Sequence, residues 1–343
     1  MNVMGILHVV NTQFEWECST ATHIDLKKSF LIHPNHVQYQ FLAFLYGKPE
    51  DYVLLTHEPE PTYWDQLKKI RPDHPKPTYI DDLQPDITYI ESWGASRLID
   101  TWATLHDLTY VHPDESVVSE VGSKEFSFVH SPQLPDSALI KNAQELQRWG
   151  EDSTFPKVLK TSFGAAGRGH QILQCKTALH CSKTIDFCDK EWSAGRPIIG
   201  EPWVDRLCDF STQWMISKSQ IHYLGCTKME CDHRGMYCGT QLITHALPEA
   251  QYQQEVAYPI LKIMQNMGFF GQVGIDGFIY DQTILHPINE INPRKTMGWL
   301  AMQLGKPISS VPAKKSRHPL LPFYVQGLAP FKLQLDLSEI VRV

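Results

Sequence analysis

The chain has 343 residues, more than one hydrophobic core usually serves, so we expect roughly two or three packed units. Hydrophobic residues make up 42% of it, as in an ordinary globular protein, and no run of about twenty apolar residues predicts a membrane span. The 38 acidic residues outnumber the 31 basic ones and give a formal net charge of −7. An extended nucleic-acid surface needs clustered cations, so this balance argues against one but allows a local basic pocket.

The first residues and the cysteines indicate a cytoplasmic protein. Residues 1–10 are apolar but lack the basic leader and the small-residue cleavage site of a signal peptide, so we expect a buried strand there. None of the eight cysteines belongs to a Cys-x-x-Cys pair, which zinc sites usually contain. We therefore expect reduced, mostly buried thiols rather than disulfides or a metal centre.

Short apolar runs alternate with amphipathic stretches over the first 120 residues. The strands predicted here are 3–10, 52–55 and 87–90, and the helices are 41–46, 63–70 and 98–108. Ser96 is expected to cap the last of these helices. Strands that alternate with helices favour a mostly parallel α/β sheet, so we predict an N-terminal domain of that class.

The rest of the chain shows the signals of antiparallel sheets, and the strands at 155–161 and 170–174 follow one another with no helix between them. The strands predicted here are 155–161, 170–174, 198–204, 210–217, 221–229, 273–280 and 284–291. A helix is expected over 248–267, with a kink or a break at Pro259. The fold class is therefore α/β followed by α+β.

The loop after the strand at 155–161 is rich in glycine. Gly164, Gly167 and Gly169 let the backbone approach an anion closely and present N–H groups to it. Lys160, at the end of the strand, supplies a positive charge suited to a phosphate. The Gly-Lys-Ser/Thr of a Walker loop is absent, and no helix follows as in a dinucleotide-binding loop. A phosphate-binding loop and a flexible hairpin turn with an incidental lysine both remain open.

A second candidate segment is Ile198–Asp205, with Asp209 shortly after it. An extended apolar segment can flank an adenine ring while its backbone groups pair with the ring edge. A carboxylate a few residues later can accept hydrogen bonds from ribose hydroxyls. An apolar strand with acidic flanks is also an everyday pattern, so the segment alone does not decide between the two readings.

The third segment is the predicted hairpin that carries Asp276 on one strand and Glu290 and Asn292 on the next. Side chains alternate along a strand, so Glu290 and Asn292 project to one face. A turn centred near residue 283 places Asp276 opposite Glu290 on that face. Two carboxylates and an amide oxygen suit a hard cation such as Mg²⁺, although a solvated acidic hairpin is the alternative. Pro287 is unusual inside a strand because it removes a ladder hydrogen bond.

In this order the three segments resemble the ATP-grasp superfamily, of the carboxylate–amine ligase type. The resemblance extends from Lys124 to Arg294, and the α/β region before it resembles the pre-ATP-grasp domain of these enzymes. It implies a pre-ATP-grasp domain at 1–120, a small lobe with a glycine-rich lid at 121–205, and a large lobe with the metal site and the C-terminal tail at 206–343.

The resemblance also implies a role for individual residues. The metal ligands would be Asp276, Glu290 and Asn292, and the catalytic residues would be Lys160 and Arg294, of which Arg294 steadies the acyl phosphate or the substrate carboxylate. The residues that would contact the nucleotide are Lys124, Lys160, Gly164, Gly167, Arg168, Gly169, Glu201, Trp203, Val204 and Asp209.

Two of these assignments are less well supported by the sequence. Lys124 has undistinctive surroundings and fits a surface helix equally well. Several ligases of the superfamily place an arginine two residues before the first metal aspartate, where this chain has Gly274, and either Arg234 or Arg168 is a candidate substitute.

The activity implied is that of an enzyme that uses ATP and Mg²⁺, with Mn²⁺ as an alternative ion, to convert a carboxylate into an acyl phosphate and join it to an amine. The partners would be a small-molecule acid and amine, with no nucleic acid and no membrane, and a homodimer is left open. Two other functions remain open: a phosphotransferase that needs no amine, and an ATP-binding regulatory protein without turnover. The sequence does not reveal the acid or the amine.

Overall fold

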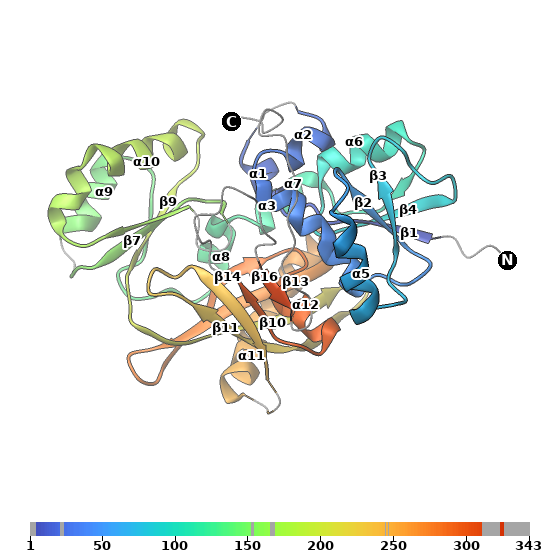
Figure 1. Cartoon of the computed structure of the whole chain (residues 1–343). Helices are drawn as coiled ribbons and strands as arrows, with labels where there is room; N and C mark the ends of the chain where they lie inside the picture. Colours follow the sequence, from blue (N-terminus) through green and yellow to red (C-terminus); the bar gives the residue numbers. More distant parts are fainter. Residues whose placement is uncertain are drawn as a thin grey trace. The chain divides into compact units, whose positions relative to one another are not determined.

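A computed structural model of the chain describes residues 5–20, 24–151, 154–164, 169–243, 245, 247–310 and 323–325 (Figure 1). Its contacts divide the chain into two compact units. Unit 1 contains the described residues of Met1–Glu115, Cys238–Leu242 and Arg294–Val343. Unit 2 contains those of Ser116–Tyr237 and Ile243–Pro293. The division into three domains that we inferred from the sequence stays a prediction.

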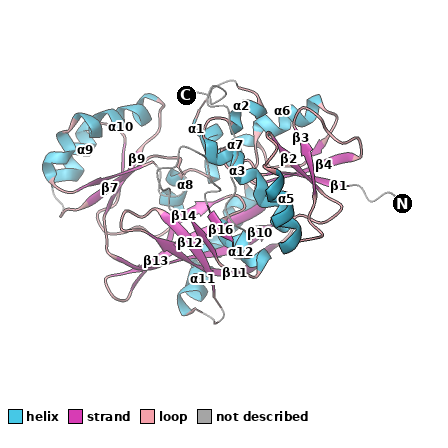
Figure 2. Cartoon of the chain, in the orientation of Figure 1, coloured by secondary structure: helices cyan, strands magenta, loops and turns pink. Residues whose placement is uncertain are grey.

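Unit 1 is built on a five-stranded sheet with the order β3-β2-β1-β4-β5. Its strands are among those drawn in magenta in Figure 2. Every neighbouring pair in the sheet is parallel, which confirms the predicted N-terminal parallel domain. The order reverses between β1 and β4, the kind of position where open α/β sheets bind ligands. The strands are β1 (Gly5–Val9), β2 (Tyr52–Leu55), β3 (Lys76–Tyr79), β4 (Ile87–Ser92) and β5 (Thr109–Tyr110).

Short helices connect these strands. They are α1 (Phe14–Ser19), α2 (Leu26–Phe30), α3 (Pro34–Tyr39), the 3₁₀ turn η1 (Gln40–Leu42), α4 (Ala43–Tyr46), α5 (Pro61–Ile70) and α6 (Arg97–Leu105). The predicted cap of α6 is confirmed, because the Ser96 hydroxyl accepts a hydrogen bond from the Ile99 N–H at 3.2 Å. Helix α7 (Glu115–Val121) belongs to unit 2 apart from its first residue.

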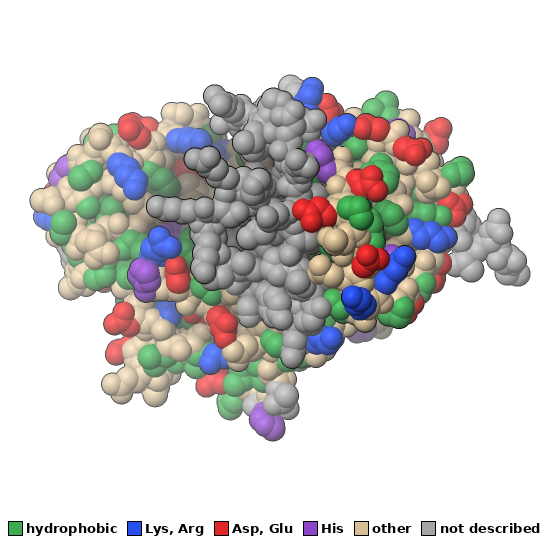
Figure 3. Space-filling model, in the orientation of Figure 1, with side chains coloured by type: hydrophobic (Ala, Val, Ile, Leu, Met, Phe, Trp, Pro, Cys, Tyr) green, Lys and Arg blue, Asp and Glu red, His purple; other side chains and the backbone are tan. Residues whose placement is uncertain are grey.

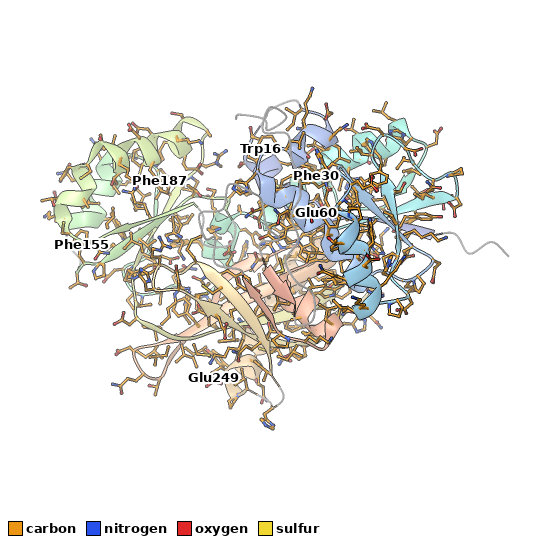
Figure 4. The ribbon with its side chains drawn as sticks, viewed as in Figure 1. Trp16, Phe30, Glu60, Phe155, Phe187 and Glu249 are labelled. Carbon is orange, nitrogen blue, oxygen red and sulfur yellow. The ribbon has the colours of Figure 1, made fainter. Side chains whose placement is uncertain are left out.

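One apolar core holds unit 1 together. It joins strand residues such as Leu7 and Leu54 to helix residues such as Phe30, all of them nearly or fully buried, and Phe30 is labelled in Figure 4. Helix α12 (Met297–Leu304), far away in the sequence, adds Trp299 and Leu300 to the same core. Strand β15 (Ile308–Ser310) pairs with both β12 (Tyr237–Leu242) and β16 (Phe323–Val325).

Unit 2 contains a small antiparallel sheet with the order β6-β9-β7-β8. Helices α9 and α10 cover one face of it (Figure 1), and Phe155 and Phe187, labelled in Figure 4, pack against the core between them. The elements are α8 (Lys124–His130), β6 (Ala138–Ile140), α9 (Ala143–Glu151), β7 (Lys157–Lys160), β8 (His170–Leu173), η2 (Lys176–His180), α10 (Ser182–Ser193) and β9 (Ile198–Pro202).

The larger antiparallel sheet of unit 2 contains the order β14-β13-β10-β11, so the predicted antiparallel sheets are confirmed. The strands are β10 (Arg206–Ile216), β11 (Ile221–Cys231), β13 (Gly271–Tyr280) and β14 (Ile284–Asn292). Helix α11 (Pro248–Asn266) packs beside them and continues through Pro259, so no break occurs there. Pro259 lies on the exposed face of α11, where water can bond the carbonyl group that lacks its helical partner.

The thiols are free, as predicted, but the expectation that most of them are buried is wrong. Only Cys188 is buried, Cys175 and Cys181 are exposed, and the other five are half-buried. The two exposed cysteines flank the short 3₁₀ helix η2, one on each side of it.

No helix in the described part of the chain is long and apolar enough to cross a membrane. Acidic and basic side chains are interspersed on the face shown in Figure 3, as the nearly balanced charge of the sequence leads one to expect.

The carboxyl group of Glu17 in unit 1 is poorly solvated. Its Oε2 accepts a 2.5 Å hydrogen bond from the Ser96 hydroxyl, and its Oε1 is buried without a hydrogen-bond partner among the described residues. Loss of hydration disfavours the charged form. Burial accordingly raises the pKa of Glu17 from 4.5 to about 7.

We therefore expect Glu17→Gln to stabilise the protein at pH 8 by roughly 2 kcal/mol and to have little effect at pH 4. Below pH 4.5 Glu17 is protonated in both the folded and the unfolded chain. As the pH rises towards 7 only the unfolded chain releases this proton, so the wild type loses stability. Urea unfolding at the two pH values measures the difference, with Glu60→Gln at an exposed position as the control (Figure 4). An equal effect of Glu17→Gln at both pH values would contradict the assignment.

Candidate functional site

Lys160 and Glu201 form a buried ion pair in the small sheet of unit 2. Strands β7 and β9 are antiparallel neighbours, with Lys160 opposite Ile199. The Lys160 Nζ lies 2.5 Å from the Glu201 Oε2, and the two side chains are only 10% and 8% exposed. Burial lowers the pKa of Lys160, and the nearby Glu201 opposes this shift. The lysine also donates to the Asn289 Oδ1 at 3.1 Å, so it links the small sheet to β14.

Lys124 reaches the same part of unit 2 from the first turn of α8, which Ser123 caps. Its Nζ lies 2.6 Å from the Glu290 Oε1 and donates to the Gly164 carbonyl at 2.8 Å. The side chain is only 13% exposed, so the alternative of a surface helix lysine does not hold. Lys124 thus joins the start of the glycine-rich loop to one of the predicted metal ligands.

The three predicted metal ligands lie together on the β13–β14 ladder. Asp276 and Glu290 are directly opposite each other, and Asn292 is opposite Gly274, one step further along the same face. The Asn292 Nδ2 donates to the Asp276 Oδ2 at 3.0 Å, so the bond uses the amide nitrogen and not the oxygen that would ligate a cation. The geometry agrees with the sequence prediction for all three side chains.

The register that pairs Asp276 with Glu290 depends on an irregularity at Pro287. Near the turn, Phe278 is opposite His286, and the register then shifts between Asp276 and Phe278. Between these two pairs β13 has one residue, Gly277, whereas β14 has three, so β14 contains two extra residues. An even number of extra residues keeps the alternation of faces, so Glu290 still projects on the side of Asp276.

Gly277 and the Pro287 carbonyl are in close contact at this irregularity. A Cβ atom at position 277 would lie 2.7 Å from both the Pro287 carbonyl oxygen and the Gln253 Nε2. The Gln253 Nε2 also donates to that carbonyl at 2.5 Å, which fixes the shifted segment against α11. Only glycine leaves room for this arrangement.

The sequence did not predict three further side chains near the ion pair: Arg206, Phe278 and His286. The Arg206 guanidinium lies 4.0 Å from the centroid of the Phe278 ring, and the Phe278 and His286 rings are 4.9 Å apart. Burial lowers the pKa of His286 to about 4, and the charges of Glu201, Lys160 and Arg206 also act on it. The imidazole is therefore neutral. The sequence did contain one sign of this cluster, which is the basic residue Arg206 between the Ile198–Asp205 segment and Asp209.

The other predicted nucleotide residues lie on the segment that runs from the end of β9 into β10. The Trp203 N–H donates to the Pro156 carbonyl at 3.0 Å, and its ring stacks on His170 with centroids 6.0 Å apart. Val204 follows directly in the segment between β9 and β10. Asp209 is buried, and its Oδ1 accepts a 3.1 Å hydrogen bond from Arg206.

The structure describes only the two ends of the glycine-rich loop. Gly169 has a φ of 77°, a backbone conformation that favours glycine, and its carbonyl accepts from the Thr161 N–H at 2.8 Å. Gly164 accepts the hydrogen bond from Lys124. The predicted contacts of Gly167 and Arg168 lie outside the described residues.

The predicted catalytic Arg294 belongs to unit 1, where its Nε donates to the Glu15 Oε1 at 2.7 Å. Its role toward a substrate stays a prediction. Arg234, a candidate substitute for the arginine missing at Gly274, is 66% exposed and pairs with Asp232 at 3.2 Å.

The oxygen donors of the hairpin fit a hard cation in part. Among the described residues, no group of three or more His, Cys, Asp and Glu side chains could hold a metal ion. Asp276, Glu290 and the Asn292 amide oxygen would supply about half of the roughly six ligands that Mg²⁺ requires. The remaining ligands would be water and substrate phosphates, as is usual for Mg²⁺ at phosphate-transfer sites.

The fold and the order of these elements are similar to those of ATP-grasp proteins. A family model described as "L-aspartate--L-methionine ligase, ATP grasp" matches residues 135–288. The [butirosin acyl-carrier protein]–L-glutamate ligase of Niallia circulans is 25% identical over 278 residues, which cover 76% of this chain. The chain spans 64% of the length of that relative.

Solved structures show the same fold at low sequence identity. The biotin carboxylase of Campylobacter jejuni has a TM-score of 0.57 and is 11% identical, over 88% of this chain and 68% of that chain. The biotin carboxylase domain of Hydrogenobacter thermophilus 2-oxoglutarate carboxylase, solved with MgADP, ADP and bicarbonate, has a TM-score of 0.55 at 15% identity over the same shares. The N5-carboxyaminoimidazole synthetase of Staphylococcus aureus has a TM-score of 0.52 at 14% identity, over 89% of this chain and 81% of that chain.

We expect Lys160→Met to lower the free energy of unfolding of unit 2 by about 3 kcal/mol, because it leaves the buried Glu201 carboxylate without its cation. The double variant Lys160→Met/Glu201→Gln removes both charges and should recover most of this loss. Urea unfolding, followed by the fluorescence of the tryptophans, compares the midpoints. An equal loss in the single and the double variant would show that Lys160 and Glu201 are not energetically coupled.

Proposed function

We propose that the protein is a ligase that uses ATP and Mg²⁺ to activate a substrate carboxylate as an acyl phosphate and joins it to an amine. The observation that carries this proposal is the convergence of two mostly buried lysines, Lys124 and Lys160, on the strand that bears Glu290 and Asn289. Cations beside carboxylates on one ladder are suited to a magnesium-bound triphosphate. The family model and the curated relative, both named as ligases, support the same reaction class.

Each group in unit 2 would have a defined part in the reaction. Asp276, Glu290 and Asn292 would hold the magnesium ion, which would neutralise the charge of the phosphates. Lys160 and Lys124 would bind phosphate oxygens with the charges that now face Glu201 and Glu290. Catalysis of this kind consists of positioning and charge stabilisation, so it needs no nucleophilic serine or cysteine.

The two steps balance in atoms and charge. A carboxylate oxygen attacks the γ-phosphorus, the bond to the β,γ-bridging oxygen breaks, and ADP leaves. The amine nitrogen then attacks the acyl carbon, phosphate leaves with the former carboxylate oxygen, and the amine loses a proton to solvent. Exclusion of water protects the acyl phosphate between the steps. Arg294 would steady the acyl phosphate or the carboxylate, as predicted from the sequence.

We propose an amino acid as one of the substrates. The names of the family model and of the curated relative specify L-aspartate, L-methionine and L-glutamate. A free α-amino acid carries both groups that the proposed reaction joins, a carboxylate and an amine. The other partner would also be a small molecule. We also propose a homodimer, and the observation that supports it is that one of the similar structures is described as a dimer.

A screen of amino acids tests the activity directly. Single amino acids and pairs of them are added with Mg²⁺ and ATP, and ADP, phosphate and the coupled product are measured. Release of ADP that depends on both an acid and an amine supports the ligase. Release that needs the acid alone would indicate a phosphotransferase, and ATP binding without release under any pair would indicate a regulatory protein.

We expect Glu290→Gln to abolish magnesium-dependent ADP release, with a loss of at least about a hundredfold, because the variant removes a metal carboxylate and the partner of Lys124. Glu255→Gln, on the exposed face of α11, is the matched control and should retain full activity. Unchanged ADP release by folded Glu290→Gln would rule out the assigned metal site.

A further inference from the structure

Two neighbouring groups, the Phe278 ring and the Asp209 carboxylate, hold Arg206 in place. It is the first residue of β10, and its side chain is only 20% exposed. Its guanidinium carbon lies 4.0 Å from the centroid of the Phe278 ring, and its Nη1 donates to the Asp209 Oδ1 at 3.1 Å. A planar guanidinium can stack flat on an aromatic face while an N–H group at its edge donates to a carboxylate, a fixed geometry that the compact ammonium group of lysine does not have.

The backbone explains why these three residues meet. On the β10–β13 ladder Asp209 is directly opposite Phe278, and Arg206 is opposite Tyr280. Phe278 is almost fully buried and cannot move away without disturbing the core of the large sheet. The Phe278 ring therefore acts as a fixed support, and the guanidinium on it has a defined direction towards Asp209.

The described contacts of Asp209 leave part of its carboxylate available. A carboxylate has about four acceptor positions, and within the described residues the side-chain hydrogen bond to Asp209 reaches Oδ1 from Arg206. The side chain of Asp209 is 11% exposed, so rotation of its carboxylate would be costly once Arg206 holds one oxygen. The other oxygen is then presented in a fixed direction.

We propose that Arg206 is a positioning residue that holds the Asp209 carboxylate for the ribose hydroxyls of ATP and thereby gives the protein its preference for ribonucleotides over 2′-deoxyribonucleotides. This inference rests on the proposed function, because it takes the site beside Lys160 and Glu201 to bind ATP. The ribose of the nucleotide carries two adjacent hydroxyl groups, and a single carboxylate that is held in place can accept a hydrogen bond from each of them.

Direct binding measurements test the inference without any turnover. Isothermal titration calorimetry of the full chain with Mg²⁺ gives the Kd of ATP and of 2′-deoxyATP for the wild type and for Arg206→Gln. We expect the wild type to favour ATP by about tenfold, and Arg206→Gln to reduce this ratio to near one, mainly by weakening ATP. Arg97→Gln, which removes the arginine of a more exposed pair with Glu115, is the control and should keep the wild-type ratio.

A double-mutant cycle separates positioning from a general structural effect. If Arg206 acts through Asp209, the double variant Arg206→Gln/Asp209→Asn has the same ratio of the 2′-deoxyATP Kd to the ATP Kd as Asp209→Asn alone. Arg206→Lys keeps the charge without the planar contact on Phe278, and it should lose about half of the discrimination on a logarithmic scale. It replaces Arg206→Gln if that variant does not fold.

The outcomes distinguish this inference from the proposed function. An unchanged ratio in folded Arg206→Gln, or losses that multiply in the double variant, would overturn the role of Arg206 and leave the ligase proposal intact. Discrimination that depends on Arg206 in a protein that never releases ADP would support the inference and sink the ligase. A wild type that binds neither nucleotide overturns both.

Discussion

The pairing of β13 with β14 is the constraint on which the candidate site of unit 2 depends. Side chains in a sheet alternate between faces, so a slip of one residue would turn Glu290 away from Asp276. The two extra residues of β14 near Pro287 leave this alternation unchanged. The close contact of Gly277 with the Pro287 carbonyl and the hydrogen bond from Gln253 keep the shifted register in place. A proline inside a strand therefore has a local structural reason here.

The charged groups around this ladder are arranged as pairs that a ligand can separate. Lys160 faces Glu201, Lys124 faces Glu290, and Arg206 faces Asp209. Removing charges from water is costly, and buried ion pairs seldom repay that cost in stability. The proposed function gives these three pairs a reason that folding does not supply. A triphosphate with its magnesium ion offers new partners of both signs, so the lysines and carboxylates could exchange partners without leaving any charge unpaired.

The polar and ionic pairs of unit 1 join segments that are far apart in the sequence. His8 on β1 pairs with Asp51 at 3.0 Å, and Lys295 pairs with Glu91 on β4. The Lys295 ammonium also lies 4.9 Å from the centre of the Tyr46 ring and 5.2 Å from that of Trp299. Burial lowers the pKa of Lys295, whereas Glu91 and its hydrogen bond raise it. These contacts connect the segment before α12 to the parallel sheet, and the apolar residues of α12 complete the attachment.

The sequence alone determined the fold class, most of the strands and the pairing of Asp276 with Glu290, because these follow from local periodicity and from the alternation of side chains. The predicted pairing agreed with the structure although β14 contains two extra residues near Pro287, because a shift by an even number of residues keeps each side chain on the same face of the sheet. Only the tertiary structure could show that Lys124 is mostly buried, that Arg206, Phe278 and His286 lie beside Glu201, and that Arg294 groups with unit 1. Burial and contact between distant segments depend on how the sheets and helices pack, and packing leaves no periodic signal in the sequence around a single lysine or arginine.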